Sequence, residues 1–193
     1  MKILSFDGTA RAASVALTDG EHTLATYTVD NGLTQSELLL PMAEHLLRST
    51  HTEFSDVELF ALTDGPGSFT GVRIGTSLVS GIAFARDIPC VGVSTLEALA
   101  ENLAGLTGLI LPVMDARRGQ VYTATFVSDG NNITRKTPDR AIALSALAEE
   151  LCAESLPIYL VGDGYAVAHR ALTEAGIKLS LTPELLIGAS AAS

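Results

Sequence analysis

A glycine-rich segment at residues 64–75 carries the groups best suited to chemistry in this chain. It lies between an apolar run at 59–62, which predicts a buried strand, and a run of small and apolar residues at 72–84, which predicts a helix. Ser68 or Thr70 can cap that helix, and free N–H groups at a helix start favour a bound anion such as phosphate. An anion cradle and a tight structural turn are both open interpretations, and the turn is somewhat favoured. Because the segment lacks the Lys-Ser/Thr ending of a P-loop, it predicts no Walker-type nucleotide site.

A second candidate is the turn Asp7-Gly8-Thr9, which follows a predicted strand at 2–7. A carboxylate and a hydroxyl at a tight turn can position a metal-bound phosphate. Asp-Gly is also a favoured hairpin turn, and that simpler interpretation is preferred for the three residues alone. The candidate residues for a nucleotide or anion loop are Asp7, Thr9, Gly65, Gly67, Ser68 and Thr70.

The sequence predicts no metal site and no catalytic residue. No two of the four histidines have the i, i+4 spacing that lets one helix hold an ion, and no Gly-x-Ser-x-Gly motif is found. Asp115 and Arg117 bracket a turn and are expected to pair with each other. The histidines are His22, His45, His51 and His169.

Composition narrows the class of protein. The chain has 193 residues, of which 47% are hydrophobic and 18% charged, so we expect a well-buried fold. The formal net charge of −10, without a long basic run, disfavours nucleic-acid binding by this chain alone. Cys90 and Cys152 lie in apolar runs and predict buried thiols in a reducing compartment. No apolar run is long enough to span a membrane, and a cytoplasmic location is expected.

The predicted elements give an α/β fold with two mixed sheets and helices against them. Three strands are followed by alternating helices and strands, and a weaker version of this order returns after a break at 103–108. We therefore expect domains at 1–103 and 104–193. Thr34 and Glu37 have capping-box spacing at the start of the first helix. The expected strands are 2–7, 12–17, 22–29, 59–62, 89–93, 109–114, 120–127 and 158–161, and the expected helices are 35–49, 72–84, 143–152, 165–175 and one from Ser94.

The two long helices of the first half suggest a partner surface. Apolar residues occupy most of the circumference of 35–47, although one face suffices to cover a sheet. The helix from Val72 carries interior glycines, each of which costs about 1 kcal/mol relative to alanine, and close packing can offset that cost. Partner binding through these helices and burial of both faces inside the fold are open at even odds.

Several segments in order resemble the TsaB (YeaZ) family, over most of the first two-thirds of the chain. The family usually has His where this chain has Gln35, and an Asp-Thr-Ser/Thr turn where this chain has Asp7-Gly8-Thr9. The matching segments are Ser14 to Leu17, Ser36-Glu37 with Leu39 to Pro41, Gly65 to Arg73, Ile88-Pro89, Gly92 to Leu99, and Asp115 to Arg117 with Val121-Tyr122.

The resemblance implies an actin/Hsp70-like (ASKHA) fold of two lobes. It also implies a non-catalytic subunit of tRNA N6-threonylcarbamoyladenosine (t6A37) synthesis, which forms a heterodimer with TsaD and activates it, with TsaE completing the assembly and tRNA bound only within the complex. The same helices would form a homodimer when TsaD is absent. No cofactor is required, and weak ATP or ADP binding at a shared interface is left open. The expected contact residues, chosen by helical phase, are Leu39, Met42, Leu46, Gly75, Val79 and Ile82.

The catalytic relative in this resemblance carries a His-x-x-x-His metal pair, at whose places this chain has Thr95 and Leu99. Leucine cannot ligate a metal. The alternative is an ASKHA-type ATPase or kinase that acts alone through Asp7, the glycine-rich segment and residues 162–164. A glycoprotease-like peptidase is the last choice, for want of a nucleophile or a metal.

Overall fold

The computed structural model describes residues 1–183 and 186–188. These residues form two compact units, Met1–Thr95 and Leu96–Gly188, and each is described by itself. The boundary differs from the expected one at 103/104, because the helix that follows Thr95 belongs with the second unit. Leu99 of that helix lies 3.2 Å from the point where a Cβ atom on Gly162 would stand. Residues 184–185 and 189–193 of the expected second domain lie outside the described residues.

The first unit is built on a five-stranded mixed sheet in the order β3-β2-β1-β4-β5. β1 to β3 form an antiparallel meander, and β4 and β5 run parallel to β1. Phe6 on β1 pairs with Val15 on β2 and with Leu62 on β4, which fixes the register of the three central strands. The strands are β1 Lys2–Asp7, β2 Ala13–Asp19, β3 His22–Val29, β4 Leu59–Gly65 and β5 Cys90–Ser94.

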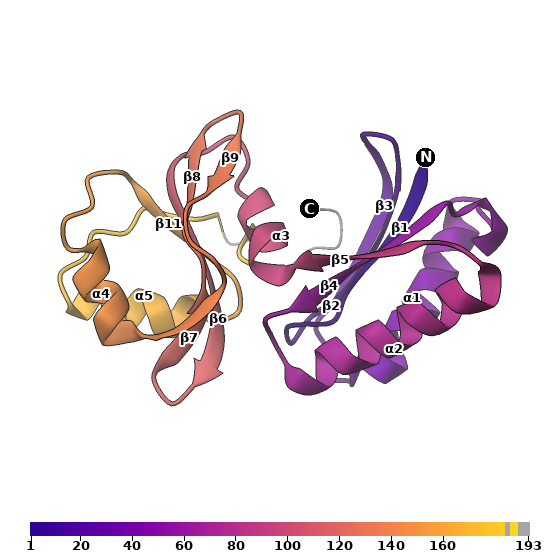
Figure 1. Ribbon diagram of the computed structural model, residues 1–193, viewed down its shortest axis with the longest axis horizontal. Helices are drawn as coiled ribbons and strands as arrows, with labels where there is room; N and C mark the ends of the chain where they lie inside the picture. Colours follow the sequence, from indigo (N-terminus) through magenta and orange to yellow (C-terminus); the bar gives the residue numbers. More distant parts are fainter. Residues whose placement is uncertain (184–185, 189–193) are drawn as a thin grey trace. The chain divides into compact units, whose positions relative to one another are not determined.

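Helices α1 (Gln35–Ser49) and α2 (Phe69–Arg86) lie beside each other along one face of this sheet (Figure 1). The hydrophobic core between them and the sheet includes Phe6, Phe60 and Leu46, all at most 2% exposed. A short 3-10 turn, Phe54–Asp56, precedes β4. Burying this apolar face is what stabilises the helices, since isolated helices of this length are marginal in water.

The starts of α1 and α2 follow from local chemistry. The N–H of Thr34 donates to the Glu37 carboxylate at 3.0 Å, which confirms the predicted capping box and lowers the pKa of Glu37. Ser68 Oγ accepts the Gly71 N–H at 3.2 Å, so Ser68 is the cap of α2. The cap starts α2 at Phe69, earlier than the expected residue 72.

The second unit contains a mixed sheet in which β6 pairs with β7 and β8 along one edge and with β11 along the other. Helices α4 and α5 pack together on one face of it (Figure 1). A short helix, α3, precedes the sheet. The elements are α3 Thr95–Glu101, β6 Thr107–Arg117, β7 Gln120–Thr123, β8 Phe126–Asp129, β9 Ile133–Arg135, β10 Arg140–Ala143, α4 Leu144–Leu151, β11 Ile158–Val161 and α5 Tyr165–Glu174.

The single strand expected at 120–127 is wrong, because it is interrupted between β7 and β8. Val113 pairs with Thr123 and Ile110 with Phe126, so the two short strands keep one register along β6. The Thr125 N–H donates to Thr137 Oγ1 at 2.8 Å instead of joining the ladder to β6. The strand β10 was not expected at all.

The two units repeat one order of elements: an antiparallel meander, a helix, a strand parallel to the first, and a second helix. In the first unit these are β1 to β3, α1, β4 and α2; in the second they are β6, β7/β8, β9/β10, α4, β11 and α5. This confirms the predicted α/β class with a mixed sheet and helices in each half.

Two further observations complete the fold. The expected burial of Cys90 and Cys152 is wrong, because both are exposed: Cys90 lies on the edge strand β5 and Cys152 just beyond α4. Among the described helices, none combines the length and the hydropathy that crossing a bilayer requires.

Candidate functional site

The turn after β1 is held by a buried carboxylate. Asp7 is 1% exposed, and its Oδ1 atom accepts three hydrogen bonds. The donors are the Thr9 N–H at 2.9 Å, Thr9 Oγ1 at 2.7 Å and Thr63 Oγ1 at 2.7 Å. Thr63 belongs to β4, so this one oxygen atom links the β1–β2 turn to the neighbouring parallel strand. Neutral hydroxyl and amide donors satisfy it, and no Lys or Arg contacts it among the described residues.

The glycine-rich loop between β4 and α2 packs directly against this turn. The Ser68 N–H donates to the Thr9 carbonyl at 2.7 Å. A Cβ atom on Gly67 would stand 2.5 Å from the Thr9 carbonyl oxygen, and one on Gly71 would stand 2.1 Å from the Gly8 carbonyl oxygen. Both glycines are therefore required for the close approach of two backbone segments.

These contacts show where each residue of the expected anion loop lies. Asp7, Thr9, Gly67 and Ser68 are brought together, and Gly65 has a φ of 121° that favours glycine. Thr70 is exposed on the first turn of α2. The Ser68 and Gly71 N–H groups already donate within the protein, so the loop serves at least as a tight turn, and an anion cradle stays a prediction.

Gln35 lies at the start of α1 beside this turn and is 8% exposed. Its Nε2 atom donates to the Ala10 carbonyl at 2.7 Å, whereas its Oε1 atom is buried without a hydrogen-bond partner in the described structure. The glutamine therefore braces the far side of the β1–β2 turn. Sequence reasoning singled out Gln35 only as a departure from a family pattern, not for this contact.

Most of the expected partner contacts on α1 and α2 are buried within the first unit, and their role in docking stays a prediction. Leu39, Leu46 and Val79 are fully buried in the core of the first unit, and Met42 is 7% exposed. Gly75 is buried too, and only Ile82 is partly exposed. Val79 is a core residue, so a charge placed there would disturb the fold rather than only a docking surface, whereas a Cβ atom on Gly75 would meet nothing within 4 Å.

A different face of α2 is open to solvent. We call it the α2 stripe, and its members recur at helical spacing on one side of the helix. Phe69 is 75% exposed and Phe84 is 91% exposed, with small residues between them. The Arg73 guanidinium stacks on the Phe69 ring at 4.9 Å, and a hollow lined in part by both borders the stripe. The stripe consists of Phe69, Arg73, Ser77, Gly81 and Phe84.

In the second unit, the segment 162–164 repeats the close packing of the glycine-rich loop. A Cβ atom on Gly162 would stand 2.3 Å from the Val113 carbonyl oxygen, and the Gly164 N–H donates to that same oxygen at 3.0 Å. Asp163 Oδ1 accepts the Asp115 N–H at 3.3 Å. Asp115 also pairs with the Arg117 guanidinium at 3.4 Å, which confirms the expected pair. These glycines and carboxylates are engaged in holding the β6–β7 turn and β11 together.

The positions singled out for metal chemistry are occupied by buried side chains. Leu99 is 1% exposed and packs near Gly162, and Thr95 is fully buried. Within residues 1–183 and 186–188, no three His, Cys, Asp or Glu side chains are grouped closely enough to hold a metal ion.

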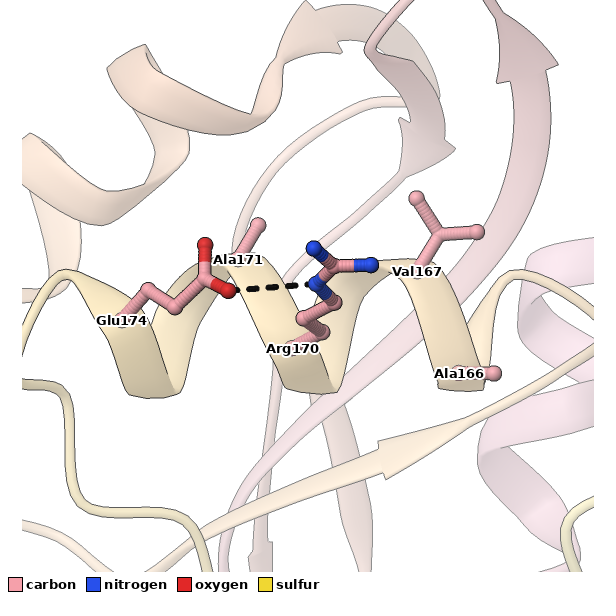
Figure 2. A pocket seen from close by; sticks show the side chains of 5 residues that line it. All are labelled: Ala166, Val167, Arg170, Ala171 and Glu174. Carbon is pink, nitrogen blue, oxygen red and sulfur yellow. Dashed lines mark hydrogen bonds and ion pairs between the residues drawn. The ribbon is translucent and has the colours of Figure 1, made fainter.

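A shallow hollow on α5 is lined by short apolar side chains and one ion pair. Figure 2 shows its lining: Ala166, Val167 and Ala171 beside an ion pair between Arg170 Nε and Glu174 Oε1 at 3.1 Å. Both charged side chains are largely exposed and joined at i, i+4 spacing, so each pairs within its own helix.

The chain has the fold of two solved structures, in agreement with the expected actin/Hsp70-like (ASKHA) fold class. A solved structure described as YeaZ from Pseudomonas aeruginosa is similar, with a TM-score of 0.78 at 24% identity over 99% of this chain and 87% of that chain. The ethanolamine utilization protein EutJ from Carboxydothermus hydrogenoformans has the same fold, with a TM-score of 0.55 at 16% identity over 97% of this chain and 87% of that chain.

Sequence comparison defines the family within this class. Residues 34–186 match the family model described as "TsaD: tRNA N6-adenosine threonylcarbamoyltransferase". The chain is 33% identical to "tRNA threonylcarbamoyladenosine biosynthesis protein TsaB" of Bacillus subtilis (strain 168), over 90% of this chain and 76% of that protein. It is 35% identical to the protein of that name in Escherichia coli (strain K12), over 78% of this chain and 65% of that protein. The chain belongs to the TsaB family.

Proposed function

We propose that this chain serves the synthesis of tRNA threonylcarbamoyladenosine as a non-catalytic subunit that binds TsaD and activates it. Support for the pathway comes from the relatives, which are named as biosynthesis proteins for this modified nucleoside. In this proposal the chain acts in the cytoplasm, and TsaE completes the assembly. The tRNA binds only within the complex, because a net charge of −10 opposes binding of a polyanion by the chain alone.

The α2 stripe is the observation that carries the docking part of the proposal. Two exposed aromatic side chains on one helix cost solvation free energy in an isolated protein, and aromatic residues are typical anchors of protein interfaces. The small residues between them, Ser77 and Gly81, allow a second helix to approach closely. We assign this surface to TsaD, and to a second copy of the chain when TsaD is absent, so that the two partners compete.

The proposal of a non-catalytic subunit is supported by the structural roles of the candidate reactive residues. The Asp7 carboxylate oxygen is occupied by three internal donors, and Leu99 fills a core position where the catalytic relative is expected to place a metal ligand. Glycines at 67 and 71 serve backbone packing. Weak ATP or ADP binding at the shared interface stays open under this proposal.

The test is the affinity of the full chain for purified TsaD, measured by isothermal titration calorimetry. Ser77→Arg and Phe84→Glu each place a charge in the α2 stripe without changing the core, and either should weaken binding by at least about tenfold. Val167→Glu, on the exposed face of α5, is the matched control and should bind like the wild type. Wild-type affinity of both stripe variants would exclude the stripe as the docking surface. ATP turnover by the isolated chain would instead support an ASKHA-type ATPase or kinase.

A further inference from the structure

The hydrogen bonds around Asp7 form a continuous path from the sheet to the first turn of α2. Asp7 Oδ1 holds Thr9 through two bonds and Thr63 through one, and the Thr9 carbonyl accepts the Ser68 N–H. Ser68 then caps α2 through the Gly71 N–H. The path therefore joins a buried carboxylate to the helix that bears the α2 stripe.

Asp7, Thr9 and Thr63 in this path are buried, so the Asp7 carboxylate loses hydration free energy and depends on its internal hydrogen-bond donors. Asp7 and Thr9 are each 1% exposed, and Thr63 is 8% exposed. A buried carboxylate loses its hydration and needs strong internal donors, and hydrogen bonds to a charged acceptor are stronger than neutral ones. Hydrophobic packing of β1 against β4 does not require a carboxylate at this position.

Within its described residues, the second unit holds the equivalent turn without a hydroxyl bridge to its aspartate. Its corresponding aspartate, Asp115, accepts the N–H of Arg117 at 2.7 Å, as Asp7 does with Thr9. However, the Asp115 side chain is 31% exposed, and continuing the β6–β11 register places Gly164, which has no hydroxyl, where β4 has Thr63. The hydroxyl bridge from the parallel strand is thus specific to the unit that carries the α2 stripe.

We propose that Asp7, bridged by Thr63 and Thr9, is a positioning residue that fixes the first turn of α2 and thereby the partner-binding face. Asp7 then acts through the loop and not by touching nucleotide, metal or partner. The expected effect of Asp7 on the affinity for TsaD rests on the proposed function. Its expected effect on the ordering of the first turn of α2 does not depend on that function.

Hydrogen exchange followed by mass spectrometry on the full chain tests the ordering directly. Thr63→Val removes one donor with little change of volume, and Asp7→Ala removes the acceptor. Both should speed exchange of the Ser68, Gly71 and Val72 amides by about tenfold or more, while peptides of the second unit stay unchanged. Thr63→Ser, which restores the hydroxyl, should return exchange to the wild-type rate, and Asp7→Asn, which keeps an acceptor without charge, should lie between.

The matched control is Thr50→Val, which removes a hydroxyl that donates to the Leu46 carbonyl at 3.0 Å at the C-terminal end of α1, in the same unit. It should leave exchange at the start of α2 unchanged. Unaltered exchange there in Thr63→Val, or a loss of protection spread evenly over the first unit, would overturn the brace. If wild type fails to bind TsaD but the exchange pattern holds, the proposed function fails and the brace stands. If Thr63→Val speeds exchange at the start of α2 yet binds TsaD with wild-type affinity, the hydrogen bonds of Asp7 do not position the α2 stripe for binding.

Discussion

Replacing Gly71 by alanine is expected to destabilise the first unit by about 2 kcal/mol, whereas the same change at Gly81 should stabilise it by about 1 kcal/mol. Both glycines lie within α2, so alanine gains about 1 kcal/mol of helix propensity at either site. A Cβ atom on Gly81 meets nothing within 4 Å. At Gly71 it meets the Gly8 carbonyl oxygen at 2.1 Å, where ordinary contacts begin at 3.4 Å.

The cost at Gly71 follows from what must move. Both contacting groups are backbone, so no side-chain rotation can relieve the overlap, and overpacking of this kind costs about 1 to 3 kcal/mol. Separating the two segments also lengthens the 2.7 Å bond from the Ser68 N–H to the Thr9 carbonyl, which adds about 1 kcal/mol. These costs outweigh the gain in propensity.

Urea unfolding of the two variants, followed by far-UV circular dichroism, measures the difference. The variants share the same chemical change in the same helix, so the unfolded states are closely matched. Equal stability of the two variants, or a Gly71→Ala protein more stable than wild type, would refute the close packing of the glycine-rich loop on the β1–β2 turn.

Three further outcomes are expected. Partial desolvation, and then the charge of Glu97, raise the pKa of Glu101, although this residue is still classed as exposed. The folded state therefore loses some stability as pH rises through that pKa, so Glu101→Gln should melt slightly higher than wild type at pH 7, and the difference in melting temperature should vanish below about pH 4. Cys90 and Cys152 should both react with a thiol reagent in the native protein, and protection of either would contradict its exposure. Thr123→Val should lower the unfolding free energy by about 1 to 3 kcal/mol, because it leaves a buried carbonyl of β6 without its 2.7 Å donor; an unchanged urea midpoint would argue against that bond.

Much of the fold was readable because local signals agreed with the tertiary structure. The Thr34–Glu37 capping box marked the start of α1, and the strands expected at 12–17 and 22–29 correspond to β2 and β3. The interruption between β7 and β8 carries no glycine or proline. It depends on a bond from Thr125 to Thr137, and such a long-range contact leaves no local pattern.

The side of α2 that is open to solvent could not be predicted from hydrophobicity, for a physical reason. On α2 the buried positions are mostly small, such as Gly71, Gly75 and Ala83, and the exposed stripe includes Phe69 and Phe84. Hydrophobicity therefore points to the wrong side of the helix. The Asp7 turn and the glycine-rich loop were recognised as candidates, but their mutual contact required the sheet register that joins β1 to β4.

The most direct test of the central claim is threonylcarbamoyl transfer to tRNA from a supplied activated threonylcarbamoyl donor, in a system reconstituted from purified TsaD, TsaE and this chain. We predict that the chain alone modifies no tRNA, that adding it raises transfer by TsaD, and that Ser77→Arg removes this gain while Val167→Glu keeps it. Modification of tRNA by the chain alone, or full activation by Ser77→Arg, would contradict a non-catalytic subunit that acts through the α2 stripe.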